Sequence, residues 1–177
     1  RYAELPYDEM TPEQQEGFRA LMESRGRLPG PAKIYVHNPK LAKVLGPVGA
    51  HFRGGYSLTE REREIAVCIV NSKWHTAYAT NAHERAAKAA GLSNEQVESI
   101  LSGLPTSFSD KREQVVYEMA NCLIASRWVS KGLYERALEA LGHVGITDVI
   151  GLMGFYTTVS MTLAFYDVPA GATGMER

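Results

Sequence analysis

The fold prediction rests on residues 74–92, which read WHTAYATNAHERAAKAAGL. Alanine is the strongest helix former, and Gly91 is the residue type that most often closes a helix in the left-handed conformation. The segment therefore predicts a closely packed helix, yet His83 stands near its middle, where alanine would serve packing equally well. At about 100° per residue, His83 shares one stripe with small residues, namely Thr76, Ala79, Thr80 and Ala87. Such a stripe suits either a ligand pocket or a close helix crossing, and a structural histidine bonded within the core is the plainer alternative.

The preceding segment, TEREREIAVCIVNS at residues 59–72, predicts a central helix. Thr59 and Glu62 form a capping box, the first turn is charged, and the remainder is apolar until residues 71 and 72. Glu64 is the last charged residue before the apolar run, so we expect its side chain to point inward.

A buried carboxylate needs a hydrogen-bonding or charged partner. If the two helices are antiparallel, Glu64 meets His83, and the carboxylate orients the imidazole while the other ring nitrogen moves a proton. The alternative is a solvated Glu64 that pairs with Arg61 or Lys73.

Capping signals predict helices along the rest of the chain as well, and no sustained period-two pattern indicates strands. The predicted fold class is all-α, a single-domain bundle of about eight helices over residues 1–177, with an N-terminal helical arm at 1–27 and a loose tail at 168–177. Residues 104–108 are predicted to be a loop. The predicted helix starts are Thr11 (to about Ser24), Pro31, Asn38 (to Gly54), Ser93 (to Gly103), Ser109 (to about Arg127), Ser130 (to about Leu141) and Thr147.

Residues 149–166 form an uncharged run of 18 residues, which approaches the length of a membrane span. The run contains threonine, serine, tyrosine and glycine, and its flanks lack the Lys and Arg clusters that orient a span. We therefore expect a buried core or subunit-interface helix rather than a membrane helix.

The amino-acid composition argues against nucleic acid and membrane lipid as binding partners. The chain has 19 basic and 20 acidic residues, a formal net charge of -1, which offers no basic field to nucleic acid or to anionic lipid. A small-molecule substrate is the expected partner. Cys68 and Cys122 suggest no disulfide framework, and the first residues lack the layout of a secretion signal, so we expect a cytoplasmic protein.

Four further residues are candidate substrate contacts. His75 and Tyr78 lie one turn upstream of the His83 stripe and could donate from the pocket rim, Thr80 lies on the stripe, and Cys68 lies one turn after Glu64. Packing alternatives remain open, since a tyrosine is often a packed aromatic and a lone cysteine in an apolar run is often an inert core thiol. No metal is expected, because seven residues separate His75 from His83, unlike the i, i+4 ligands of helical zinc sites.

The order of these elements resembles the carboxymuconolactone decarboxylase and alkylhydroperoxidase-D-like family. The resemblance covers most of the chain, and its most specific parts are LTEREREI at 58–65, a histidine 19 residues after the last glutamate of that segment, and AAGLSNEQV at 89–97. It implies an all-helical subunit that assembles as a trimer or hexamer, with an active site near the subunit boundary. Glu64 and His83 match the proton-relay glutamate and histidine of the family.

The sequence departs from both branches of that family. The peroxidase branch carries Cys-x-x-Cys where this chain has Thr76 and Ala79, and the decarboxylase branch usually carries Tyr-Glu-Trp where this chain has Tyr78, Ala79 and Thr80. A thiol peroxidase cycle needs a nucleophilic thiolate and normally a resolving thiol close by.

The sequence therefore favours a cofactor-independent acid/base enzyme that acts on a small carboxylated, lactone-type molecule, with decarboxylation as the nearest named reaction. His83 would be the general acid/base and Glu64 its orienting partner. Two alternatives are a non-catalytic ligand-binding or oligomeric protein, and a peroxidase-like protein that lacks Cys-x-x-Cys and uses Cys68.

Overall fold

The computed structural model describes residues 2–26, 28 and 30–171 and contains eight α-helices and one short 3-10 helix, with no β-strand among those residues. The all-α prediction of about eight helices is confirmed. The helices are η1 (Tyr7–Glu9), α1 (Pro12–Arg25), α2 (Gly30–Tyr35), α3 (Pro39–Gly54), α4 (Glu60–Trp74), α5 (Ala77–Ala89), α6 (Asn94–Leu101), α7 (Lys111–Ile124) and α8 (Lys131–Tyr166).

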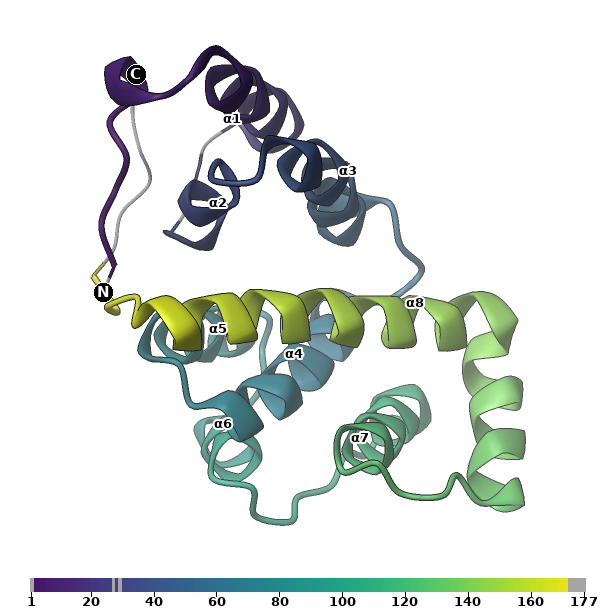
Figure 1. Cartoon of the computed structure of the whole chain (residues 1–177). Coiled ribbons are helices and arrows are strands. Elements are labelled where there is room, and N and C mark those ends of the chain that lie inside the picture. Colours follow the sequence, from purple (N-terminus) through teal and green to yellow (C-terminus); the bar gives the residue numbers. More distant parts are fainter. Residues whose placement is uncertain (1, 27, 29, 172–177) are drawn as a thin grey trace.

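The helices lie in two groups on either side of the long part of α8 (Figure 1). On one side, α1, α2 and α3 surround a small apolar core that includes Phe18, Leu21 and Tyr35. On the other side, α4 to α7 share a larger core with α8. Helix α8 thus supplies the surface on which the second group of helices is assembled.

Helix α4 is the centre of the larger core, because it packs against α5, α6, α7 and α8. Each residue of its run 65–70 is at most 1% exposed. The polar side chains of α4 that face inward must therefore find partners on the surrounding helices.

Local signals fix the helix ends. The predicted capping boxes at Thr11, Thr59 and Ser93 are all present. Gly91 follows α5 with φ 93°, a left-handed conformation that favours glycine. The start of α7 was predicted wrongly: Asp110, not Ser109, caps it, and its carboxylate accepts from the backbone N–H groups of residues 112 and 113. A carboxylate also complements the helix dipole, which a serine hydroxyl does not.

Helix α8 is bent at one residue. Gly142 has φ 62° and ψ 179°, which separates residues 131–141 from residues 143–166. The two helices predicted for this region exist, and Ser130 caps the first. Thr147 does not cap the second, since its hydroxyl donates to the carbonyl groups of His143 and Val144 inside the helix. The break comes from the backbone freedom of glycine rather than from a side-chain cap.

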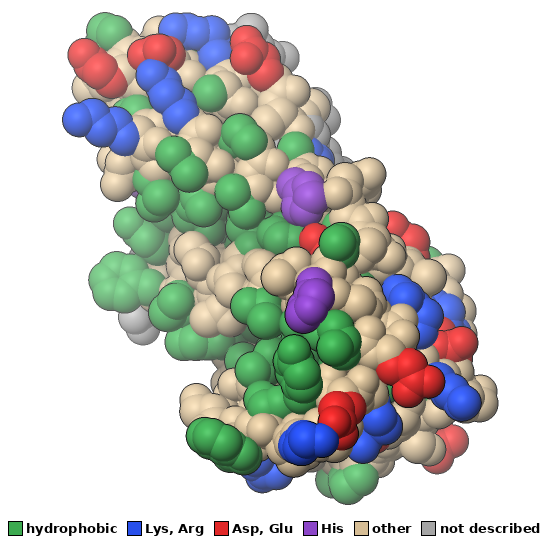
Figure 2. Space-filling view, turned by 90° about the vertical axis from the view of Figure 1, so that its right-hand side faces the viewer, with side chains coloured by type: hydrophobic (Ala, Val, Ile, Leu, Met, Phe, Trp, Pro, Cys, Tyr) green, Lys and Arg blue, Asp and Glu red, His purple; other side chains and the backbone are tan. Residues whose placement is uncertain are grey.

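The apolar part of α8 has one buried and one exposed face. By length and composition it could cross a membrane, and 39% of its most apolar 18-residue window is buried within the chain. Exposed apolar side chains on this helix include Ile150, Met161 and Phe165. Hydrophobic side chains also gather down the middle of the face shown in Figure 2, between charged side chains at its two ends. Of the predicted loose tail, Val168 is buried, and residues 172–177 lie outside the described residues.

Candidate functional site

Glu64 and His83 meet between α4 and α5. Glu64 lies in the second turn of α4, its side chain has no exposed surface, and its Oε2 is 2.8 Å from His83 Nδ1. His83 lies in the middle of α5, and its side chain is 16% exposed. The contact that the sequence predicts between these two residues is therefore present.

The contact fixes the protonation pattern of the imidazole. A carboxylate accepts hydrogen bonds, so the neutral ring carries its proton on Nδ1 and presents Nε2 as a base. When Nε2 takes a proton, the buried carboxylate stabilises the resulting cation. The ring can thus alternate between a base and an acid without changing its orientation.

Arg63 completes the environment of the carboxylate. Its Nε and Nη2 donate to Oε1 of Glu64 at 2.9 and 2.5 Å, and Nη2 also lies 2.8 Å from Glu60 Oε2. Burial alone would lower the pKa of Arg63, but the neighbouring Glu64 carboxylate outweighs burial and raises it. Arg63 therefore stays charged and donates two hydrogen bonds to the Glu64 carboxyl group.

The alternative considered from the sequence, a solvated Glu64 that pairs with Arg61 or Lys73, is wrong. Arg61 does not pair with Glu64 but with Glu113, through its Nε at 2.5 Å and its Nη2 at 2.9 Å. Lys73 lies near the other end of α4. Sequence spacing could not identify Arg63, because adjacent residues on a helix usually point in different directions.

Tyr156 and Asn71 are site residues that sequence reasoning missed. The Tyr156 ring of α8 lies edge-on to the His83 ring, with centroids 4.9 Å apart and an interplanar angle of 89°. Asn71 is fully buried; its Nδ2 donates to the carbonyl of Ala79 at 3.4 Å, and its Oδ1 accepts from Ser160 at 3.4 Å. Asn71 thereby links α4, α5 and α8, and it shares the face of α4 that carries Glu64, since 64, 68 and 71 follow helical spacing.

Two threonine hydroxyls lie on the His83 stripe of α5 without a partner. Thr76 Oγ1 and Thr80 Oγ1 are buried, and no described protein group lies within hydrogen-bonding distance of either. Thr76 is the N-cap residue of α5, yet its hydroxyl makes no capping hydrogen bond. A buried hydroxyl without a partner is unfavourable, so both oxygens are hydrogen-bonding groups that no described protein atom satisfies.

The remaining predicted contacts occupy different places. Cys68 is fully buried, its Sγ lies 3.8 Å from the carbonyl oxygen of His83, and burial, followed by the charges of Glu64 and Glu84, raises the pKa of its thiol. Cys68 therefore has no exposed surface through which a substrate could contact its thiol. His75 is exposed and ends α4 with φ 47°.

Tyr78 packs on α2. A Cβ atom on Gly30 would lie only 3.1 Å from the Tyr78 ring, which shows how closely the ring approaches that backbone. Neither Tyr78 nor His75 contacts the Glu64–His83 pair in any described hydrogen bond, ion pair or ring contact. In the described part of the chain, no group of three or more His, Cys, Asp or Glu side chains is arranged to hold a metal ion.

Comparison with known proteins identifies the fold. No protein-family profile matches the sequence, and no curated protein matches it. A peroxidase-related protein from Silicibacter sp. TM1040 has a TM-score of 0.69 at 20% identity, with 96% of this chain and 94% of that chain covered. The debrominase Bmp8 in complex with 2,3,4-tribromopyrrole has a TM-score of 0.67 at 16% identity, with 91% and 87% covered. Apo Bmp8 has a TM-score of 0.65 at 15% identity, with 89% and 85% covered.

These likenesses show the architecture. The chain has the alkylhydroperoxidase-D-like fold, in a single domain. Within that fold, α4 and α5 bring the buried carboxyl group of Glu64 to the partly exposed imidazole of His83.

Proposed function

We propose that this protein is an acid/base enzyme of the carboxymuconolactone decarboxylase-like family, which acts without a cofactor on a small carboxylated, lactone-type molecule. The observation that carries the proposal is the contact between the fully buried Glu64 and the partly exposed His83. A carboxylate that holds Nδ1 leaves Nε2 to take and return a proton, which is the requirement for general acid/base catalysis.

Decarboxylation of an unsaturated lactone acid fits this pair. The bond to the carboxylate carbon breaks, carbon dioxide leaves, and the electron pair passes into the conjugated carbonyl. Protonated His83 then delivers its Nε2 proton to the carbon at the end of that conjugated system, and a proton from water restores the imidazolium. Glu64 stabilises the imidazolium, while Arg63 holds the Glu64 carboxyl group in place through its hydrogen bonds.

The two unpartnered hydroxyls support a polar substrate. Thr80 and Thr76 lie on the same stripe as His83, one and two turns toward the start of α5. We assign Thr80 to substrate hydrogen bonding, with Tyr78 and His75 as residues of the outer rim. A carboxylate bound near the N-terminal end of α5 also gains from the helix dipole.

We further propose that the protein is a cytoplasmic homo-oligomer, a trimer or hexamer, which binds neither nucleic acid nor membrane. The net charge of -1 supports the absence of both. The exposed apolar side chains of α8, such as Met161 and Phe165, support self-association, since large exposed apolar surfaces mark interfaces. Sedimentation at increasing protein concentration tests this, and a monomer at all concentrations would contradict it.

The experiment is a screen of unsaturated lactone acids for loss of carbon dioxide, run in parallel with thermal unfolding. Turnover that disappears in His83→Gln supports the enzyme. A molecule that raises the melting temperature without product would instead indicate a non-catalytic binding protein.

A peroxidase-like activity is a testable second candidate, because one structural relative is described as peroxidase-related. Cys68 opposes it, since burial raises the pKa of the thiol and removes it from solvent. Peroxide consumption that is lost in Cys68→Ser but retained in Cys122→Ser would favour the peroxidase over the acid/base enzyme.

A further inference from the structure

A pocket of about 520 Å³ lies away from the Glu64–His83 pair. Its volume is in the range of small-molecule sites. Its walls come from the end of α4, the α6–α7 loop, α7 and the α7–α8 loop. The lining residues are Lys73, Gly103, Leu104, Pro105, Tyr117, Glu118, Asn121, Cys122, Ala125, Arg127 and Trp128.

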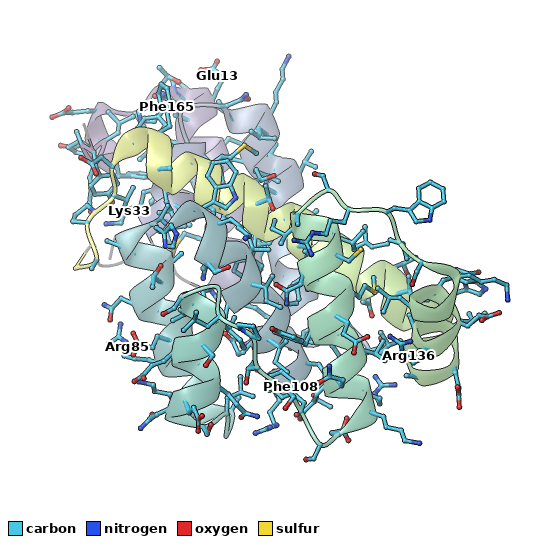
Figure 3. The ribbon with its side chains drawn as sticks, turned by 90° about the horizontal axis from the view of Figure 1, so that it is seen from below. Glu13, Lys33, Arg85, Phe108, Arg136 and Phe165 are labelled. Atoms are coloured by element: carbon cyan, nitrogen blue, oxygen red, sulfur yellow. The ribbon has the colours of Figure 1, made fainter. Side chains whose placement is uncertain are left out.

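The pocket is distinct from the candidate acid/base site. None of its lining residues belongs to α5 or to residues 143–166 of α8, which carry His83 and Tyr156. Figure 3 labels Arg85 on α5 and Arg136 on α8 at opposite sides of the molecule. Arg136 pairs with Glu118, one of the lining residues of the pocket.

Two backbone turns hold the pocket open. At the end of α6, the N–H of Gly103 donates to Ile100 and that of Leu104 to Ser99, at 3.1 and 2.8 Å. At the end of α7, the N–H of Ser126 donates to Leu123 and that of Arg127 to Cys122, both at 3.0 Å. This paired pattern closes the carbonyl ends of both helices.

A further hydrogen bond joins the two walls. The backbone N–H of Thr106 donates to the Tyr117 hydroxyl at 3.2 Å, which ties the α6–α7 loop to α7. Backbone hydrogen bonds thus fix the two loops that form walls of the pocket. A preformed site binds a ligand without an ordering penalty in the loops.

The charges that line the pocket do not cancel. Lys73 and Arg127 have no carboxylate partner among the described residues. Glu118 is the only acidic lining residue, and its two oxygens are occupied by Gln114 at 2.8 Å and by Arg136. The Gln114 hydrogen bond and then the Arg136 contacts lower the pKa of Glu118. Its charge is compensated, and the pocket keeps two uncompensated cations.

An exposed tryptophan adjoins these cations. Trp128 is 92% exposed and Leu104 is 60% exposed, although both line the pocket. The turn at Ser126, with φ 53°, directs the chain into Arg127 and Trp128. The Cys122 thiol contacts the carbonyl of Trp128 at 3.5 Å, which holds that segment against α7. The backbone of Trp128 is thus fixed, and its exposed indole offers a stacking surface for a planar apolar group.

We propose that this pocket binds a small aromatic carboxylate, separately from the acid/base site. The carboxylate is bound by Lys73 and Arg127, and the ring lies against Trp128. Arginine can bind a carboxylate through two parallel hydrogen bonds, which gives such a ligand a defined orientation. The proposal does not depend on the function of His83.

Tryptophan fluorescence of the intact chain tests the proposal with benzoate as the probe. The chain has two tryptophans, so Trp74→Phe leaves Trp128 as the sole reporter. Benzoate is expected to quench it saturably, and calorimetry on the unmodified protein should give the same affinity. Lys73→Gln and Arg127→Gln should each weaken binding about 5-fold or more, which corresponds to about 1 kcal/mol.

Two control variants test whether benzoate binds at this pocket. Lys40→Gln removes an exposed cation on α3, and His83→Gln alters the acid/base site; neither should change benzoate binding. Benzyl alcohol, which lacks the charge, should bind much more weakly. Equal quenching by benzyl alcohol, quenching that never saturates, or loss of binding in His83→Gln would overturn the proposal. The proposal would also be overturned if the protein self-associates and benzoate neither binds to the associated form nor separates the two copies of the chain.

Discussion

Two buried carboxylates two residues apart on α4 have different partners. Glu62 is 1% exposed; it accepts the backbone N–H of Thr59 at 2.9 Å and the Arg112 guanidinium at 2.8 and 3.3 Å. Arg112 also donates to the carbonyl of Ala140, so Glu62 ties α4 to α7 and α8. Glu64 is also buried, but one of its partners is the imidazole of His83, a group that can gain or lose a proton.

The difference shows what separates a structural ion pair from a chemical one. All partners of Glu62 among the described residues are backbone groups or a guanidinium, and neither exchanges a proton with a substrate near neutral pH. Glu64 faces Arg63 on one side and a titratable, partly exposed imidazole on the other. Burial of a carboxylate is common to both and does not by itself identify a site.

The largest effect expected is that of His83→Gln. The amide still reaches Glu64 but cannot carry a proton, so turnover of a substrate found in the screen should fall by about 10²- to 10⁴-fold. The measurement is kcat and KM with circular dichroism to check folding. A folded variant with full turnover would remove His83 from the chemistry.

Glu62→Gln should mainly lower stability, whereas Glu64→Gln should mainly lower turnover. Loss of the Glu62 charge leaves Arg112 unpaired and should lower the free energy of unfolding by about 1–3 kcal/mol, with turnover retained. Loss of the Glu64 charge removes the group that stabilises the imidazolium and should lower kcat more than it lowers stability. Urea unfolding and kinetics on both variants measure this.

The matched pair provides its own control, since both substitutions remove one charge from the same helix. If both variants lose stability and turnover in the same proportion, the distinction between the two carboxylates fails. A pH–rate profile adds a second readout, because only Glu64→Gln removes the carboxylate that contacts the His83 ring and should change the pH dependence of kcat.

Thr80→Val and Thr76→Val should have smaller effects. In each variant, stability should be unchanged or higher while substrate binding becomes weaker. Removal of a buried hydroxyl without a protein partner should leave the free energy of unfolding unchanged or raise it by about 1 kcal/mol. If the hydroxyl binds substrate, KM should rise in the same variant. A clear loss of stability would show that the hydroxyl has a structural partner.

Asp148→Asn should have the smallest effect, and it depends on pH. Burial alone would raise the pKa of Asp148, but hydrogen bonds from Ser57 at 2.7 Å and the contact with His51 outweigh it and lower the pKa. A lowered pKa in the folded state contributes stability above the unfolded value of about 3.9, and this is lost as pH falls through the folded value.

The variant should therefore be less stable than the unmodified protein at pH 7, by about 1 kcal/mol or less, and the difference should shrink as the pH falls below about 3.9. Urea unfolding between pH 3 and pH 7 measures the difference. Asp8→Asn, an exposed position in η1, is the control and should show no such trend.

The sequence predicted the features that depend on local signals. Capping boxes, glycine stops and the apolar run of α4 lie within a few residues of one another, so helix ends and the inward position of Glu64 could be inferred. The contact with His83 followed from two consecutive helices and from the family resemblance. Thr147 and Ser109 were wrong as caps because a neighbouring glycine and aspartate supply stronger signals.

The rest of the site depends on distant parts of the chain. Tyr156 and Ser160 reach the site only because α8 crosses α4 and α5, which no local pattern encodes. Arg63 was missed because side-chain direction at adjacent helix positions requires the rotamers. The unpartnered state of the Thr76 hydroxyl is equally invisible, since a threonine before a helix normally caps it.

The bend at Gly142 has a consequence for how copies of the chain assemble. Its φ of 62° and ψ of 179° place residues 131–141 beside α7, where Arg136 meets Glu118 (Figure 1). Were this glycine helical, residues 131–166 would form one straight rod of about 54 Å, and the short arm would leave its own α7. An alanine there disfavours the bend, so we expect Gly142→Ala to yield intertwined dimers in which each arm docks on the α7 of the other copy.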